Sequence, residues 1–196
     1  MMLKYLFLSV LPIFLSTAAN ASRDEAEQIA TDLVEGFHET LQIVMKESDG
    51  QGREKLLAPA VGLFFDVERI SRISLGRVWR RLDDGKQSSF RESLTELITV
   101  TYADRFGAFD GQVFRLDKAE IVKKGVVVKT TILKNGVELA RLNYYFREDK
   151  VFNVVANGIS DLSLRRAEYG SVIKEKGFDV LLAQIRQKIK ETRDSY

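Results

Sequence analysis

The sequence predicts an α+β fold in which a twisted antiparallel sheet of four or slightly more strands packs against N- and C-terminal helices. Hydrophobic residues recur at helical spacing before residue 107 and again after residue 161. Between them, four segments show the two-residue alternation of strands and are joined by very short connections. Such connections favour an antiparallel meander, and helices on either side of it favour the α+β class.

Residues 1–21 have the features of a cleaved secretory signal peptide. Lys4 supplies a positive charge, Tyr5 to Leu15 is an apolar segment too short to span a bilayer, and Ala19-Asn20-Ala21 matches a small-residue cleavage site. An uncleaved membrane anchor is the alternative. Cleavage leaves one domain over residues 22–196, and we expect it to be soluble because no second apolar run reaches membrane-spanning length.

The composition excludes several functions. Cysteine is absent, which removes disulfides, thiol catalysis and thiolate metal sites, and His38 alone cannot anchor a usual zinc site. The 30 Lys and Arg residues nearly balance the 28 Asp and Glu residues, so there is no electrostatic reason to expect nucleic acid binding. We therefore expect neither a metal nor a cofactor.

Helical periodicity places the helices. The first helix, over 23–47, carries an apolar face formed by Ala26, Ile29, Ala30, Leu33, Phe37, Leu41 and Val44. A short helix over 53–60 is expected to end near Pro59, and a further short segment starts at Phe64. The remaining helices are expected over 87–106, 162–175 and 178–193. Ser160 or Asp161 is expected to cap the first of the two C-terminal helices.

Four strands are expected over 112–122, 125–134, 138–147 and 150–157. Lys123-Lys124-Gly125, Lys134-Asn135-Gly136 and Arg147 to Lys150 supply the turns, and Asn-Gly is a strong hairpin signal. One face of the sheet is apolar and rich in aromatic residues, formed by Val126, Val128, Ile132, Ala140, Leu142, Tyr144, Phe146, Phe152, Val154 and Ala156. Val151, Asn153 and Val155 are expected on the opposite face of the last strand.

This apolar face is compatible with two architectures. It could pack tightly against the helices as an ordinary core, or the helices could be held apart to leave a cavity for hydrocarbon. Both arrangements need the same composition, so periodicity does not separate them.

No catalytic constellation is present, and a set of ordered features instead resembles the MlaC-like, or toluene-tolerance auxiliary, family. The set is Phe65-Asp66, Arg69-Ile70-Ser71, Leu75 to Arg80, a helix from Phe90 to Tyr102, Val154 to Ser160, Arg166 with Tyr169, and Gly177 before Leu181-Leu182. Members of that family are periplasmic carriers of membrane lipid. The resemblance implies a non-enzymatic protein with an apolar pocket between sheet and helices.

The resemblance also implies cargo and partners. Phe152 and Asn153 stand where phospholipid carriers typically have Trp and Asp, and Asn157 to Tyr169 is closest to the hopanoid-biosynthesis-associated HpnM branch. The cargo is therefore expected to be phospholipid or hopanoid. An inner-membrane lipid transport complex and an outer-membrane acceptor are the implied partners, and a monomer is expected.

The pocket of such a carrier is expected to be lined by Phe65, Tyr102, Val128, Leu142, Tyr144, Phe146, Val154 and Ile159. Among the paired arginines Arg80-Arg81 and Arg165-Arg166, we select Arg80 and Arg166 as headgroup ligands, because guanidinium groups bind phosphate bidentately. On this assignment a Val128→Glu change would block lipid loading and leave the fold largely intact.

Two rivals belong to other classes. One is an enzyme on a similar scaffold, for which Asp66 and Tyr102 are the only candidate catalytic side chains. The other is a protein-binding adaptor with a fully packed core.

Overall fold

The computed structural model describes residues 15–196 of the chain, and side chains from residue 22 onward. The helices before the sheet are α1 (Leu15–Val44), α2 (Gly50–Phe64), α3 (Val67–Leu75), the 3-10 turn η1 (Trp79–Arg81) and α4 (Asp84–Arg105). The sheet contains β1 (Gln112–Val122), β2 (Gly125–Lys134), β3 (Val137–Arg147), β4 (Lys150–Ala156) and β5 (Ile159–Ser160). Helices α5 (Asp161–Lys176) and α6 (Phe178–Arg193) complete the chain.

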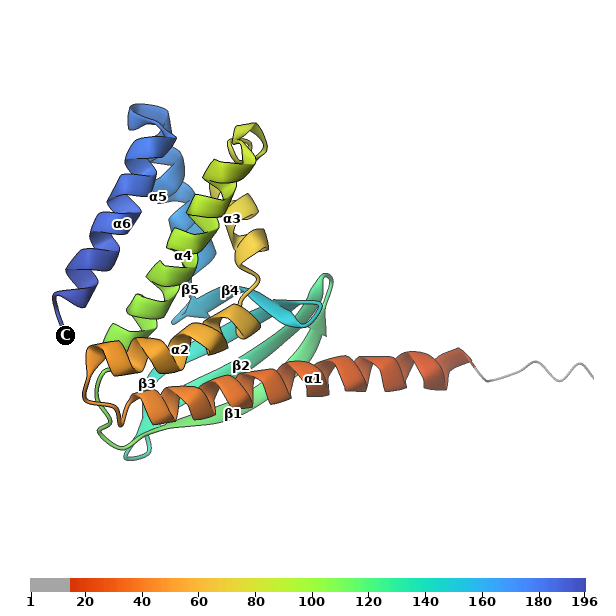
Figure 1. The fold of residues 1–196 in the computed structure, drawn as a ribbon. Helices are drawn as coiled ribbons and strands as arrows, with labels where there is room; N and C mark the ends of the chain where they lie inside the picture. The colour runs from red at the N-terminus through yellow and green to blue at the C-terminus, as the bar shows by residue number, and fades with distance from the viewer. Residues whose placement is uncertain (1–14) are drawn as a thin grey trace, which may run out of the picture.

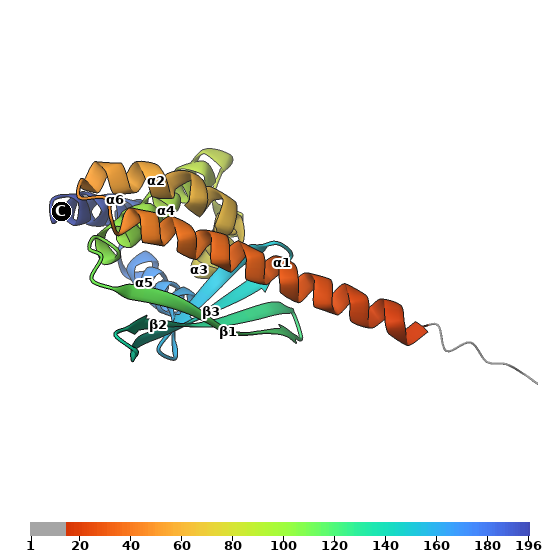
Figure 2. The ribbon, with the colours of Figure 1, turned by 90° about the horizontal axis from the view of Figure 1, so that it is seen from below.

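The five strands are antiparallel neighbours in chain order, which confirms the predicted meander and the α+β class. Helices α1 and α2 cross the sheet, and α3 to α6 rise from it as a separate group (Figure 1). Seen from below, α1 crosses the sheet obliquely and continues past its edge (Figure 2). Helix α6 contacts α4 and α5 rather than the sheet.

Local sequence explains most element ends. Asp49, Asp66, Asp83 and Ser160 each accept a hydrogen bond from a backbone N–H in the first turn of the helix that follows, as good N-caps do. Asn135 and Gly136 both have positive φ, 51° and 78°, which is the conformation that the β2–β3 hairpin turn requires. These positions explain why the expected strands lie within a residue or so of the observed ones.

Several expectations differ from the structure. Helix α2 continues through Pro59, because Val61 and Phe64 beyond the proline are buried and their packing offsets the lost hydrogen bond. A bulge opposite Tyr145 and Phe146 pairs Val151 with Phe146 and turns Val151 inward, where it is fully buried. The short strand β5 was not expected.

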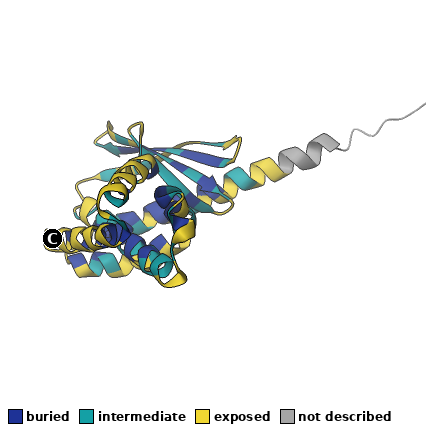
Figure 3. Cartoon of the chain, turned by 90° about the horizontal axis from the view of Figure 1, so that it is seen from above, coloured by how far each residue is buried: buried dark blue, intermediate teal, exposed yellow. Residues whose placement is uncertain are grey.

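The first helix begins at Leu15 rather than at residue 23. Residues 1–14, which contain most of the expected signal peptide, lie outside the described residues. Within the described part, none of the helices is long and apolar enough to cross a membrane. Buried positions concentrate where the helices meet the sheet, while the first turns of α1 that have described side chains extend beyond it and are exposed (Figure 3).

Candidate functional site

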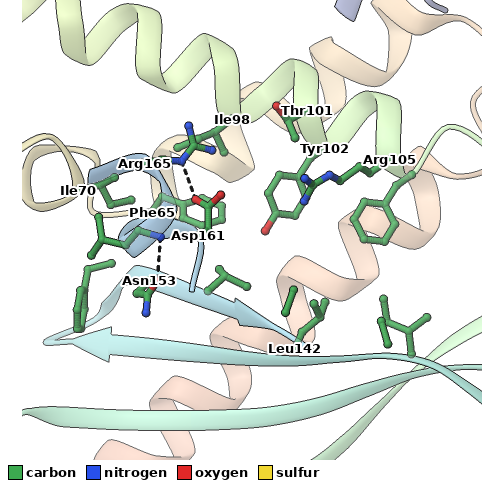
Figure 4. A pocket seen from close by; sticks show the side chains of 17 residues that line it. Phe65, Ile70, Ile98, Thr101, Tyr102, Arg105, Leu142, Asn153, Asp161 and Arg165 are labelled. Atoms are coloured by element: carbon green, nitrogen blue, oxygen red, sulfur yellow. Dashed lines mark hydrogen bonds and ion pairs between the residues drawn. The ribbon is translucent and has the colours of Figure 1, made fainter. Parts of the chain in front are cut away.

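A cavity of about 250 Å³ lies between one half of the sheet and the helices above it. Its floor is formed by β2, β3 and β4, through Ile132, Ala140, Leu142, Val154 and Ala156. Its roof is one face of α4, with Ile98, Thr101, Tyr102 and Arg105 (Figure 4). Its sides are formed by Phe65, Ile70, Phe106, Phe152, Asn153, Asp161, Leu162 and Arg165.

Small side chains on the floor leave this half of the sheet unfilled. Ala140 lies opposite Ile132, and Ala156 lies opposite Leu142. A methyl group at these positions leaves space below α4 that a larger side chain would fill. Most of the surface that surrounds this space belongs to carbon atoms, as is usual for sites that hold hydrophobic ligands.

A wall of three aromatic rings closes the cavity on the side of α1. The ring of Phe37 lies 5.4 Å from Tyr102 and 5.7 Å from Phe65, and Phe65 lies 5.7 Å from Tyr102. The two Phe37 contacts are edge-to-face, a favourable arrangement for such pairs. We call Phe37, Phe65 and Tyr102 the aromatic wall.

Beyond the aromatic wall the same face of the sheet is filled. Phe64 stacks on Phe37 at 4.2 Å and meets Tyr144 and Phe146 edge-on at 5.6 and 5.9 Å. The Tyr144 hydroxyl and His38 Nε2 are hydrogen-bonded at 3.0 Å. The His38 ring also stacks on Phe114 at 4.1 Å. Burial lowers the pKa of His38 to about 4, so the ring is neutral at neutral pH.

Two polar residues of α5 face the cavity as a pair. Arg165 donates from Nε to Asp161 Oδ2 at 2.6 Å and from Nη1 to the Tyr169 hydroxyl at 3.1 Å. Burial acts to lower the pKa of Arg165, but Tyr169 and Asp161 outweigh it and raise that pKa. The Arg165 guanidinium is therefore charged and fixed in position.

The roof contributes Tyr102 and Arg105, one turn apart on α4. The Tyr102 hydroxyl points toward the floor of the cavity, with the Arg105 side chain beside the ring (Figure 4). Burial is the main reason that the pKa of Tyr102 is raised, so the hydroxyl stays protonated. Arg105 and Asp161 line the cavity and are also exposed to solvent. The cavity therefore opens to solvent between α4 and the start of α5.

Comparison with known proteins identifies the family. A family model described as MlaC protein matches residues 34–187, which is more than half of the chain. The chain belongs to the MlaC family. This agrees with the resemblance stated above, whereas its assignment to the HpnM branch stays a prediction.

A solved structure also resembles this MlaC-family chain. It is the phospholipid-binding protein from Ralstonia solanacearum in complex with a phospholipid, with a TM-score of 0.72 and 18% sequence identity. The match covers 85% of this chain and 98% of that chain. At this level of identity the likeness shows a shared fold.

Four of the residues expected to line a pocket are brought together in this MlaC-family structure. Phe65, Tyr102, Leu142 and Val154 all line the cavity, and they come from the α2–α3 junction, α4, β3 and β4. Trp79 lies outside the cavity and is buried against Phe90 in the core.

The other four residues that were expected to line the pocket lie outside the cavity. Val128, Tyr144 and Phe146 share the helix-facing side of the sheet with the cavity floor, but they are fully buried beyond the aromatic wall, under α1 and α2. Ile159 is 58% exposed because it follows the tight Asn157-Gly158 turn. Alternation along a strand predicts the face correctly, and it cannot predict which part of that face a helix covers.

The two arginines selected as headgroup ligands also lie outside the cavity. Arg80 is exposed on η1. Arg166 donates from Nη1 to the Ile73 carbonyl oxygen at 3.1 Å and so connects α5 to α3. The neighbouring Arg165 faces the cavity instead, because successive residues of a helix point about 100° apart.

The residues expected to line a pocket did not include Thr101, Arg105, Ala140 and Ala156, which line the cavity. A signal for the first two exists, since Ile98, Thr101, Tyr102 and Arg105 follow helical spacing along one face of α4. A cation at the end of an otherwise apolar stripe indicates where that stripe reaches water. No comparable signal distinguishes Ala140 and Ala156 from the other apolar strand residues on the same face of the sheet.

The two candidate catalytic residues, Asp66 and Tyr102, differ in their surroundings. Asp66 caps α3 by accepting from the Arg69 backbone N–H at 2.9 Å, and it pairs with Arg69 Nε at 2.7 Å. The raised pKa of Tyr102 moves it away from the range useful for acid–base catalysis near neutral pH. The described residues contain no group of three or more His, Cys, Asp or Glu side chains that could hold a metal.

Proposed function

We propose that this protein is a non-enzymatic carrier that holds the hydrocarbon part of a membrane lipid in the cavity. The observation that carries the proposal is a largely apolar cavity, closed on one side by the aromatic wall and open to solvent beside Arg105 and Asp161, in a chain of the MlaC family. Phe65, Tyr102, Leu142 and Val154 are the proposed contacts of the hydrocarbon.

The hydrophobic effect provides the driving force. Each methylene group removed from water contributes roughly 0.8 kcal/mol, so even part of one acyl chain binds appreciably. The volume of about 250 Å³ lies slightly below the range of roughly 300–1,000 Å³ usual for ligand sites. We therefore expect the cavity to widen when a whole lipid enters.

Cargo, location and partners are proposed as follows. The cargo is a phospholipid or a hopanoid, and the phospholipid bound to the similar Ralstonia solanacearum protein supports the first. The N-terminal sequence supports export to the periplasm. There, a monomeric carrier would exchange lipid with an inner-membrane transport complex and an outer-membrane acceptor.

Native mass spectrometry tests the proposal. Protein expressed from the full-length sequence and purified from the cell envelope should carry one lipid, and extraction should yield a phospholipid or a hopanoid. A mass without ligand, together with no lipid uptake from added vesicles, would contradict the carrier function and favour the adaptor.

A further inference from the structure

The opening of the cavity has an excess of positive charge. Arg105, Arg165 and Asp161 all line it. The charge of Asp161 is offset by Arg165, which it contacts at 2.6 Å. Among the charged residues that line the cavity, Arg105 is therefore the one whose charge no lining carboxylate offsets.

Arg105 also differs from Arg165 in its bonding. Arg165 is fixed by Asp161 and Tyr169, with a side chain only 14% exposed. Within residues 22–196, no ion pair or hydrogen bond engages the Arg105 guanidinium, which lies beside Tyr102 in the close-up view (Figure 4). A guanidinium has five N–H donors, and those of Arg105 are available to a ligand.

The Tyr102 hydroxyl supplies a further donor at the same place. No protein acceptor within residues 22–196 engages it, and it points into the cavity. Arg105, Arg165 and Asp161 all lie close enough to influence its ionisation electrostatically. The neighbouring Thr101 hydroxyl, in contrast, donates to the Leu97 carbonyl oxygen at 2.6 Å, so its proton is already used.

We infer that Arg105, together with the Tyr102 hydroxyl, binds the phosphate of a phospholipid headgroup at the opening of the cavity. The inference rests on the proposed carrier function and deepens it, because it selects a phosphate-bearing lipid over a phosphate-free hopanoid. A planar guanidinium binds two phosphate oxygens at once, and such charge-assisted hydrogen bonds are stronger than neutral ones. The headgroup would stay at the surface while the acyl chains occupy the space over Leu142 and Ala156.

The test compares two lipids that differ only in the phosphate headgroup. Protein from the full-length sequence, stripped of lipid, is titrated with dioleoylphosphatidylglycerol and with dioleoylglycerol, and bound lipid is quantified by native mass spectrometry. Arg105→Gln should weaken binding of the phospholipid about tenfold, as expected for a lost charge-assisted hydrogen bond. Binding of dioleoylglycerol should not change. Arg105→Lys keeps the charge but loses the planar two-point contact, so it should restore only part of the affinity that Arg105→Gln loses. Tyr102→Phe should lower the affinity by a smaller factor than Arg105→Gln.

Controls separate the headgroup contact from other effects. Arg186→Gln removes an exposed arginine of α6, outside the cavity, and should leave both affinities unchanged. Thermal unfolding of each variant confirms that it is folded. Glycerophosphate, which has the phosphate without the tails, should compete only weakly; tight binding of glycerophosphate would assign the site to a free phosphate compound and overturn the inference.

The outcomes distinguish this inference from the carrier function itself. If wild-type protein binds the phospholipid and Arg105→Gln binds it equally well, the headgroup contact is wrong and the carrier function stands. An equal loss for both lipids would show that Arg105 shapes the cavity rather than binding phosphate. If wild-type protein binds neither lipid, the headgroup contact is wrong, and the carrier function fails with it when the protein also takes up no hopanoid.

Discussion

The two halves of one sheet face behave in opposite ways. Over one half, Phe64 of α2 stacks on Phe37 of α1 and contacts Tyr144 and Phe146, which are fully buried. Over the other half, α4 spans a floor that includes Ala140 and Ala156, and a cavity remains. We call these the closed half and the open half. Strand β3 contributes to both, through Tyr144 and Phe146 on one side and Ala140 and Leu142 on the other.

This difference indicates how one face of a sheet can stabilise the fold in one half and leave space for a ligand in the other. Tight aromatic packing in the closed half fixes the sheet against α1 and α2, so the open half does not need to be filled for the protein to fold. Substitutions in the closed half should therefore change the free energy of unfolding. Substitutions in the open half should change lipid binding instead.

The largest expected effect is that of Phe64→Ala in the closed half. Phe64 is buried and contacts Phe37, Tyr144 and Phe146, so its truncation should lower the free energy of unfolding by about 3–5 kcal/mol. Denaturant unfolding measures this. Leu63→Ala on the same helix is the matched control, because Leu63 is 74% exposed, and it should cost less than about 0.5 kcal/mol. Equal losses in the two variants would contradict the assignment of a closed half.

The next effect depends on pH and involves His38. Its pKa is lowered by burial from 6.5 to about 4, so protonation favours the unfolded chain. The contribution of neutral His38 to the free energy of unfolding is complete above pH 6.5. It is lost as the pH falls toward 4, where the free energy of unfolding should be lower by about 3 kcal/mol. Denaturant unfolding at a series of pH values should show this slope above the range in which carboxylates protonate. His38→Gln should abolish the slope between pH 6.5 and 4.5, and a slope that persists would exclude His38 as its source.

A smaller loss is expected for Tyr144→Phe. This change keeps the ring and removes the hydroxyl that is hydrogen-bonded to His38 at 3.0 Å. A buried polar group left without its partner costs about 1–3 kcal/mol. Thermal unfolding should therefore show a clear but limited decrease, with lipid binding unchanged, because Tyr144 lies beyond the aromatic wall. Loss of lipid binding in a folded variant would extend the site into the closed half.

The smallest effect on folding is expected from Ala156→Leu in the open half. The added side chain enters free space rather than a packed core, so the free energy of unfolding should change by less than about 1 kcal/mol. The same change occupies part of the cavity and should strongly reduce lipid uptake from vesicles. Ala183→Leu, at an exposed position of α6, is the control and should take up lipid normally. Normal uptake by Ala156→Leu would argue against this cavity as the binding site.

Much of the fold could be predicted from the sequence because its signals are local. Turn residues such as Asn135-Gly136 and alternation along β2 and β3 define the meander, and aspartate and serine caps define several helix starts. The bulge that turns Val151 inward and the passage of α2 through Pro59 were not predictable. Both are decided by tertiary packing, which overrides local preference.

The site was only partly predictable for a related reason. Residues on one sheet face share the same composition whether a helix fills the space above them or not. Val128 shows the consequence: it was expected in a pocket, yet it is fully buried in the closed half. A Val128→Glu change would therefore place an unpaired charge in packed core and unfold the protein, rather than selectively prevent loading.

The most direct test of the account locates the hydrocarbon within the protein. A phospholipid with a photoreactive diazirine near the middle of one acyl chain is loaded into protein from the full-length sequence, irradiated and mapped by peptide mass spectrometry. Cross-links are expected in the open half, at Phe65, Leu142, Val154 or Ala156. Cross-links confined to the exposed faces of α1 and α2, or to Ile159, would contradict the claim that this cavity holds lipid.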